Sequence, residues 1–128
     1  MNIAGLGTDL VEVARLDQSI DRHGDRFLHR VFTDAEIAYC AGMKSATPFY
    51  AARFAAKEAV SKALGTGIGA ACGWRDIEVR RKASGEPFIV LHGAAEETAR
   101  RLGITAVLIS LSHTENYAIA QAIAVRGE

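Results

Sequence analysis

The segment "RFAAKEAVSKALGTG", residues 53–67, decides the fold of this chain because it predicts a long helix without a polar face. On a 3.6-residue wheel, alanines 52, 55, 56, 59 and 63 share one side, and larger apolar residues take most of the other. Between these two sides lie four charged residues: Arg53, Lys57, Glu58 and Lys62. A buried charge is costly unless it is paired or bound to an ion, so these side chains either reach water or form a site.

Signals at both ends set the length of this helix. Thr47 is a good N-cap and Pro48 suits the first helical position, so we expect the helix to begin there. We expect it to continue to about Leu64, where Gly65 provides a C-terminal stop.

The elements around the helix predict an α+β fold in one domain, residues 1–128. Strand patterns occur at 2–13, 75–82, 87–93, 106–113 and 117–125, and helix patterns at 14–31 (interrupted by Gly24), 33–42 and 94–103. The short helix at 33–42 opens with a capping box formed by Thr33 and Glu36. In the last strand, alanines 118, 120, 122 and 124 line one face, and the alanine side of the long helix is the obvious partner. We therefore expect a mainly antiparallel sheet packed against a long central helix.

Composition limits the classes of function. The chain has 128 residues and a formal net charge of +0, which argues against a general nucleic-acid binder. It has no signal-peptide pattern and no apolar run long enough to span a membrane. Cys40 and Cys72 form neither a CxxC pair nor a zinc motif, and they read as reduced thiols. We expect a cytoplasmic protein that binds neither nucleic acid nor membrane.

Asp9 and Glu58 are the carboxylates of most interest. In the first strand, Gly5, Gly7 and Asp9 share a face, so the glycines leave room for something to approach the backbone beside Asp9. Two carboxylates brought together repel unless a cation lies between them, and oxygen ligands favour Mg²⁺. The simpler alternative for Glu58 is a helix salt bridge to Lys62 at i,i+4 spacing.

Basic residues on the same helix fit a phosphate ligand. Arg53, Lys57 and Lys62 would surround the ion with positive charge, as is usual for handling a pyrophosphate. The alternative for Arg53 and Lys57 is a pair of solvated side chains. His113, at the end of a strand, is either a hydrogen-bonded structural residue or a ligand of phosphate. A nucleophilic pair with Ser112 is disfavoured because adjacent strand residues face opposite ways.

An arginine row follows the first strand. Arg15, Arg22, Arg26 and Arg30 share a helical spacing, which indicates either a solvated face or a surface for an acidic partner.

Several of these segments together resemble a known family. They are "GLGTDLVEVARL" (5–16), "RFAAKEAVSKALGTGIG" (53–69), "DIEV" followed by "SGEP", and "SLSHT" followed by "YAIAQAIA". In this order they resemble the bacterial holo-acyl-carrier-protein synthases, the short class of 4′-phosphopantetheinyl transferases. The chain differs at Glu86, where members of the family often carry a basic or small residue.

The resemblance implies a reaction. The family uses Mg²⁺ to transfer the phosphopantetheine arm of coenzyme A to a serine of an acyl carrier protein, releasing adenosine 3′,5′-bisphosphate for fatty acid biosynthesis. Asp9 and Glu58 match the family's metal ligands, and Lys62 matches a lysine that contacts the pyrophosphate. The catalytic base is Glu58 or a metal-bound water that it orients.

The resemblance also implies binding residues and an assembly. Arg53 and Lys57 align with basic positions near coenzyme A, and His113 aligns with a histidine near its adenosine phosphates. The class is typically a homotrimer with active sites between subunits, so we expect a neighbouring subunit to cover the apolar helix.

Under this resemblance we expect the acidic carrier protein to dock on Arg15, Arg22 and Arg26. The main rival interpretation is a non-catalytic trimeric module that binds coenzyme A or a nucleotide as a regulator. An adaptor that uses only the arginine row is a third.

Overall fold

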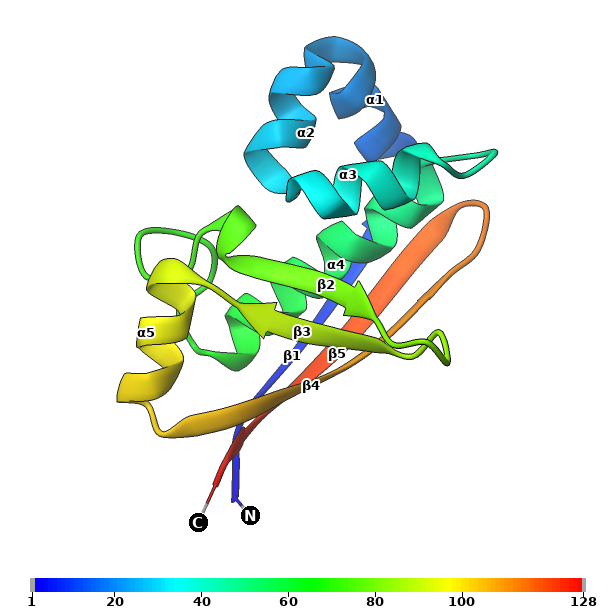
Figure 1. The fold of residues 1–128 in the computed structure, drawn as a ribbon. Helices are drawn as coiled ribbons and strands as arrows, with labels where there is room; N and C mark the ends of the chain where they lie inside the picture. The colour runs from blue at the N-terminus through cyan, green and yellow to red at the C-terminus, as the bar shows by residue number, and fades with distance from the viewer. Residues whose placement is uncertain (1, 128) are drawn as a thin grey trace.

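A computed structural model describes residues 2–127 of the chain, and Figure 1 shows its fold. The elements are β1 (Asn2–Glu12), α1 (Val13–His23), α2 (Asp25–Val31), α3 (Asp34–Ala41), α4 (Thr47–Ala63), the 3₁₀ turn η1 (Trp74–Asp76), β2 (Ile77–Arg81), β3 (Pro87–Leu91), α5 (Gly93–Arg101), β4 (Ile104–His113) and β5 (Tyr117–Arg126). Within this range no helix is both long and apolar enough to cross a membrane.

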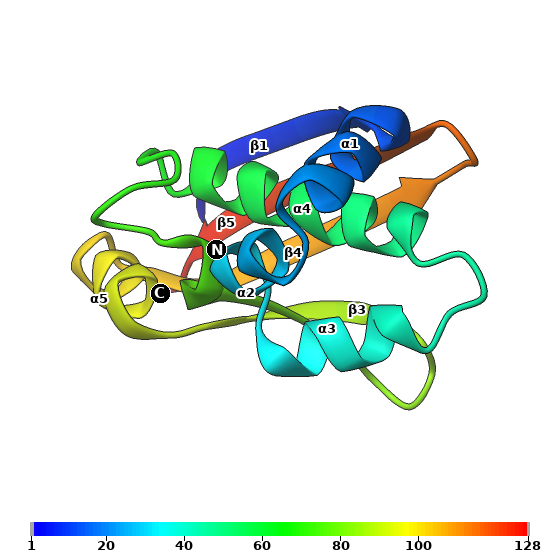
Figure 2. The ribbon, with the colours of Figure 1, turned by 90° about the horizontal axis from the view of Figure 1, so that it is seen from above.

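Two antiparallel sheets and a long helix form the body of the molecule. The larger sheet has the strand order β1-β5-β4, and β2 pairs with β3 in a separate hairpin. Helix α4 lies between the larger sheet and the elements α1, α3 and β2 (Figure 2). This arrangement confirms the expected α+β fold with an antiparallel sheet against a long helix.

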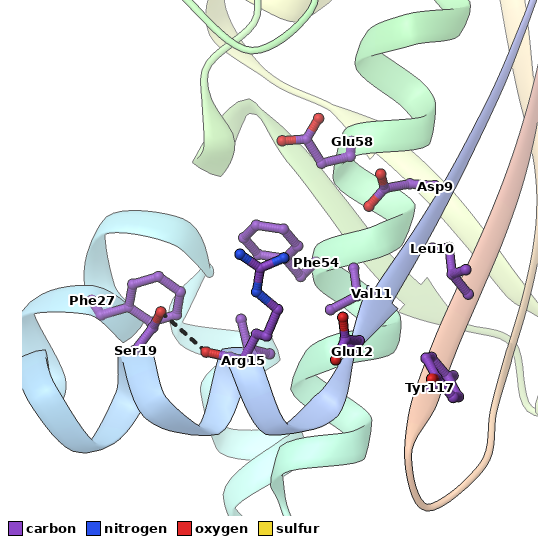
Figure 3. Close-up of a pocket in the computed structure, with 11 residues that line it drawn as sticks. Asp9, Leu10, Val11, Glu12, Arg15, Ser19, Phe27, Phe54, Glu58 and Tyr117 are labelled. Atoms are coloured by element: carbon purple, nitrogen blue, oxygen red, sulfur yellow. Dashed lines mark hydrogen bonds between the residues drawn. The ribbon is translucent and has the colours of Figure 1, made fainter.

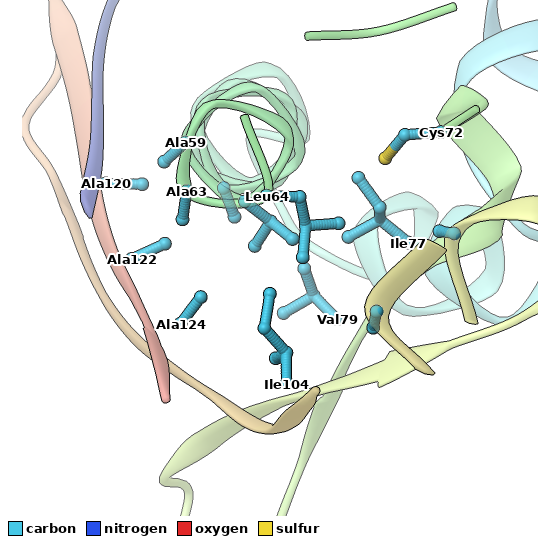
Figure 4. Packing of buried hydrophobic residues seen from close by; sticks show 14 of the residues in the cluster. Ala59, Ala63, Leu64, Cys72, Ile77, Val79, Ile104, Ala120, Ala122 and Ala124 are labelled. Carbon is cyan, nitrogen blue, oxygen red and sulfur yellow. The ribbon is translucent and has the colours of Figure 1, made fainter. Parts of the chain in front are cut away.

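Alanines form the contact between β5 and α4. Ala120, Ala122 and Ala124 are buried and face Ala59 and Ala63 across the core, as Figure 4 shows. Side chains this small allow a helix and a sheet to approach closely, so the predicted pairing of the two alanine faces is confirmed.

The closest approach lies between β1 and α4. A Cβ atom built on Gly5 would lie 2.0 Å from the carbonyl oxygen of Ala63, and one built on Gly7 would lie 1.8 Å from that of Ala59. The free space predicted beside Asp9 is therefore filled by the backbone of α4 itself. The two glycines bring the functional face of β1 against the functional face of the helix.

The expectation that α4 needs a neighbouring subunit to cover it is wrong. Both of its apolar sides are covered within its own chain, and Ala55, Ala56 and Val60 have no exposed surface. Sequence patterns alone could not show this, because the covering elements come from distant parts of the chain.

The predicted helix ends hold with one exception. Gly24 separates α1 from α2 with a φ of 55°, and Thr33 and Glu36 form the expected capping box. Thr47, however, is not the N-cap of α4. That position belongs to Ala46, and the Thr47 hydroxyl instead donates to Asp17 at 2.9 Å.

We expect Gly7→Ala to destabilise the fold by about 3 kcal/mol or more, because the added methyl group would overlap a backbone carbonyl that cannot rotate away. Thermal unfolding measures the loss. Gly69→Ala is the matched control, since nothing lies within 4 Å of its added Cβ. Equal melting temperatures for the two variants would contradict the close contact.

Candidate active site

The fold brings Asp9 and Glu58 to the same pocket. Asp9 comes from β1 and Glu58 from α4, and both line a pocket of about 530 Å³ (Figure 3). Their proximity follows from the glycine contacts, because Gly7 places β1 against the helix at Ala59, the residue after Glu58. The sequence prediction that these two carboxylates meet is confirmed by this geometry.

The pair is electrostatically unfavourable without a cation. Burial raises the pKa of Glu58, the negative charge of Asp9 raises it further, and Lys62 acts in the opposite direction. A carboxylate held beside another in a partly buried pocket gains affinity for a positive charge.

Lys62 supplies part of that charge and contacts Asp9 rather than Glu58. Its ammonium lies 3.3 Å from an Asp9 carboxylate oxygen and donates to the Thr8 carbonyl at 2.9 Å. Its side chain is half-exposed, and these two contacts leave one N–H for a ligand next to Asp9. The local alternative, a Glu58–Lys62 salt bridge along α4, is therefore not what this side chain forms.

The rest of the pocket combines apolar side chains with Glu12, Ser19 and Arg15. Phe27 of α2 and Phe54 of α4 line it, and Arg15 of α1 extends between them (Figure 3). Trp74 of η1 stacks on the far side of Phe54 with ring centroids 4.8 Å apart. The sequence analysis missed these aromatic residues, because an aromatic side chain in an apolar helix carries no signal that it lines a pocket.

Arg53 and His113 lie elsewhere. Arg53 lines a different pocket of about 330 Å³ with Tyr39 and Arg81, and its guanidinium sits 4.2 Å from the Tyr39 ring centre. In the described part of the chain, its Nε is the one buried side-chain nitrogen or oxygen without a hydrogen-bond partner. The His113 ring packs against Phe49 at 4.7 Å. Neither residue lines the Asp9–Glu58 pocket of its own chain.

Lys57 differs most from its expected role. Its side chain is fully buried, and its ammonium contacts Glu36 at 2.8 Å and the carbonyl oxygens of Trp74, at 3.0 Å, and Ile77. Burial lowers the pKa of Lys57, and the charge of Glu36 opposes that effect. An ammonium with three acceptors has no donor left for coenzyme A, so this geometry gives the expected contact no support.

The arginine row is divided by the end of α1. Arg15 and Arg22 lie together beside a small pocket on α1. Arg26 is also exposed but belongs to α2, beyond the break at Gly24. The row therefore spans two helices, as the predicted interruption at Gly24 requires, and all three side chains are exposed.

The donor set fits a hard divalent cation. Asp9 and Glu58 offer only carboxylate oxygens, the ligand type that Mg²⁺ prefers. Among residues 2–127, no group of three or more His, Cys, Asp or Glu side chains is placed to hold a metal. Two carboxylates leave coordination positions for water and substrate phosphate, as Mg²⁺ sites in phosphoryl-transfer enzymes require.

Comparison with known proteins identifies the family. Residues 5–122 match the model of the 4′-phosphopantetheinyl transferase superfamily, and the chain belongs to that superfamily. A holo-[acyl-carrier-protein] synthase of Koribacter versatilis is 51% identical over 121 residues, covering 94% of this chain and 97% of the relative.

Solved structures share the fold. The holo-[acyl-carrier-protein] synthase of Neisseria meningitidis superposes with a TM-score of 0.91 at 33% identity, covering 98% of this chain and 100% of that one. The Helicobacter pylori synthase in complex with coenzyme A gives a TM-score of 0.84 at 32% identity, covering 94% and 99%.

We expect Asp9→Asn to lower the pKa of Glu58 in the metal-free protein and Lys62→Met to raise it, because the first removes a negative neighbour and the second a positive one. An NMR titration of the Glu58 side-chain carboxyl carbon in the presence of EDTA measures both shifts. Shifts of the same sign in the two variants would show that these charges do not act on Glu58 as described.

Proposed function

We propose that this chain is a Mg²⁺-dependent, homotrimeric holo-acyl-carrier-protein synthase that moves phosphopantetheine from coenzyme A to a carrier serine. The observation that carries the proposal is that Asp9 and Glu58 line one pocket, with the ammonium of Lys62 paired to Asp9. The similarity to synthases, one of them solved with coenzyme A, supports the substrates. Cys40 and Cys72 are free thiols, which fits a cytoplasmic reaction.

The residues at the pocket would have three roles: holding the metal, stabilising negative charge and accepting a proton. Bound Mg²⁺ would supply charge neutralisation at the pyrophosphate of coenzyme A, and Asp9 and Glu58 are the residues that would hold it. Lys62, paired with Asp9, would offer a positive charge to the negative charge that develops on the departing phosphate. The carrier serine must lose its proton, and the Glu58 carboxylate, or a water that it orients, is the group placed at the pocket to accept it.

We expect Asp9→Asn and Glu58→Gln each to reduce transfer by about 100-fold or more at saturating Mg²⁺ while leaving the fold intact, because each removes a charged ligand and keeps its volume. The assay incubates the protein with apo carrier protein, coenzyme A and Mg²⁺ and detects the modified carrier by mass spectrometry. Glu97→Gln, an exposed carboxylate on α5, is the control. Near-normal turnover in either site variant would refute the metal assignment.

The same assay separates the rival interpretation. Coenzyme A binding without any transfer to several carrier proteins would favour the non-catalytic regulatory module. Transfer rules that module out.

An exposed apolar sheet face supports the trimer. The outer side of β1-β5-β4 carries large side chains that water reaches: Ile3, Leu6, Leu10, Leu108, Tyr117 and Ile119, each between 41% and 68% exposed. Such a patch is unusual for a monomer and typical of a subunit interface. The reason for proposing a trimer is thus this sheet and no longer helix α4.

A shared active site would explain the placement of Arg53 and His113. Both lie outside the pocket that Asp9 and Glu58 form in the same chain. We infer that they face the nucleotide of coenzyme A bound at the pocket of a neighbouring copy.

We expect Leu6→Asp to break the trimer into monomers, because it places a charge in the centre of the apolar face, where the monomer itself leaves Leu6 68% exposed. Light scattering measures the molar mass of the assembly in solution. Leu102→Asp, an exposed leucine at the end of α5, should leave the assembly unchanged. A wild-type protein that is active as a monomer would overturn the proposal.

The carrier protein would dock on α1 and the start of α2. Arg15 extends into the pocket, and Arg22 and Arg26 lie exposed beyond it, so an acidic helix seated there would present its serine to Glu58. Contacts of this kind mainly affect the rate of encounter and its dependence on salt.

We expect Arg22→Glu to raise the KM for the carrier about tenfold, because reversing a charge replaces attraction with repulsion on the order of 1–2 kcal/mol. The affinity for coenzyme A and the melting temperature should not change. Arg100→Glu, on the exposed side of α5, is the control. A change in coenzyme A affinity with no change in the carrier KM would place Arg22 at the nucleotide site instead.

A further inference from the structure

Two buried charges, Lys57 and Glu36, are not used by the proposed chemistry. Lys57 and Glu36 have side chains with no exposed surface and form an ion pair at 2.8 Å. Lys57 directly precedes Glu58 on α4, so any constraint on one side chain acts on the helix turn that carries the other.

Glu36 connects three elements through one carboxylate. One of its oxygens accepts from the Thr33 N–H at 2.8 Å and from Lys57, and the other accepts from the Val79 N–H at 2.8 Å. The carboxylate therefore caps α3, forms an ion pair with Lys57 of α4 and accepts a hydrogen bond from a backbone N–H of β2. The Glu36 side chain itself has no exposed surface, and hydrogen bonds in such surroundings are strong and their geometry is strict.

Lys57 is equally saturated. Its three donors meet Glu36, the Trp74 carbonyl and the Ile77 carbonyl, which belong to α3, η1 and β2. These acceptors come from different directions, and together they fix where α4 can point this side chain. On the opposite side of the helix, Gly7 fixes the distance to β1.

Rotation of α4 about its axis translates directly into displacement of Glu58. A side-chain end lies roughly 6 Å from the axis of a helix, so a 10° rotation moves it by about 1 Å. A metal site that depends on two carboxylates from different elements tolerates little displacement of that size. The contacts of Lys57 oppose such a rotation.

We propose that Lys57 and Glu36 are positioning residues: their buried pair sets the rotation of α4 and so holds the Glu58 carboxylate at coordination distance from Asp9. Lys57 acts through Glu58 and does not touch coenzyme A. The inference rests on the proposed role of Glu58 as a ligand of Mg²⁺, and it changes the expected role of Lys57 from substrate binding to alignment of the metal site.

The test compares two lysines of the same helix. Lys57→Met removes the buried ammonium, and Lys62→Met removes the half-exposed ammonium that pairs with Asp9. For each variant we would measure the melting temperature, the Kd for coenzyme A in the presence of EDTA, and the Mg²⁺ concentration that gives half-maximal transfer, the last well below the melting temperature.

Lys57→Met should lower the melting temperature by about 10 °C or more, because it leaves the Glu36 charge buried alone. The Mg²⁺ concentration for half-maximal transfer should rise about tenfold or more, as is typical when a group that orients a metal ligand is lost. The Kd for coenzyme A in EDTA should stay within about twofold. Lys62→Met should show the reverse: a stable protein whose metal-free Kd for coenzyme A rises about tenfold.

Glu36→Gln provides an independent variant, which keeps Lys57 and serves if Lys57→Met fails to fold. Like Lys57→Met, it should raise the Mg²⁺ concentration that gives half-maximal transfer. The double variant Glu36→Gln/Lys57→Met should lose less free energy of unfolding than the sum of the losses in the two single variants, because it leaves no unpaired charge buried.

Two results would overturn the inference. A stable Lys57→Met protein with weakened coenzyme A binding in EDTA would make Lys57 a substrate ligand. A destabilised protein with an unchanged Mg²⁺ requirement would make the pair purely structural. A wild-type enzyme that needs no divalent cation would instead refute the proposed function, while the coupling between Lys57 and Glu36 in thermal unfolding would still be measurable.

Discussion

The contact between the backbones of β1 and α4 is the constraint on which the site depends. Gly5 and Gly7 have no side chain at the two places where carbonyl groups of Ala63 and Ala59 come closest. Because strand and helix meet at this distance, Asp9 reaches the pocket next to Glu58 and Lys62. The small alanine side chains of β5 also allow this close approach, because they let α4 pack directly against β5, the strand next to β1.

The charges along α4 fall into two groups with different environments. Lys57 and Arg53 are buried, and their charges are met by a carboxylate or an aromatic ring and by carbonyl oxygens. Glu58 and Lys62 are accessible to solvent, and Glu58 lines the pocket. A buried pair adds little net stability compared with apolar residues, but it restricts orientation. Helix α4 thus carries buried charged side chains with fixed partners and, next to them, charged side chains that water reaches.

Local patterns in the sequence predicted much of this architecture. The alternation in β1, the alanine face of β5 and the capping box at Thr33 follow from short-range periodicity, and the structure confirms them. Long-range pairing could not be predicted in this way. That Glu36 neutralises Lys57, or that the chain itself covers α4, depends on elements far apart in sequence, and no local signal distinguishes a paired buried lysine from one that binds a ligand.

The central claim is that α4 and β1 together hold one divalent cation between Asp9 and Glu58. A crystal grown with coenzyme A and Mn²⁺ as a substitute for Mg²⁺ tests it through anomalous scattering from the metal. The account predicts a single peak in each active site, within about 2.5 Å of an oxygen from both carboxylates and next to the pyrophosphate. A peak that contacts neither Asp9 nor Glu58, while coenzyme A is bound, would contradict it.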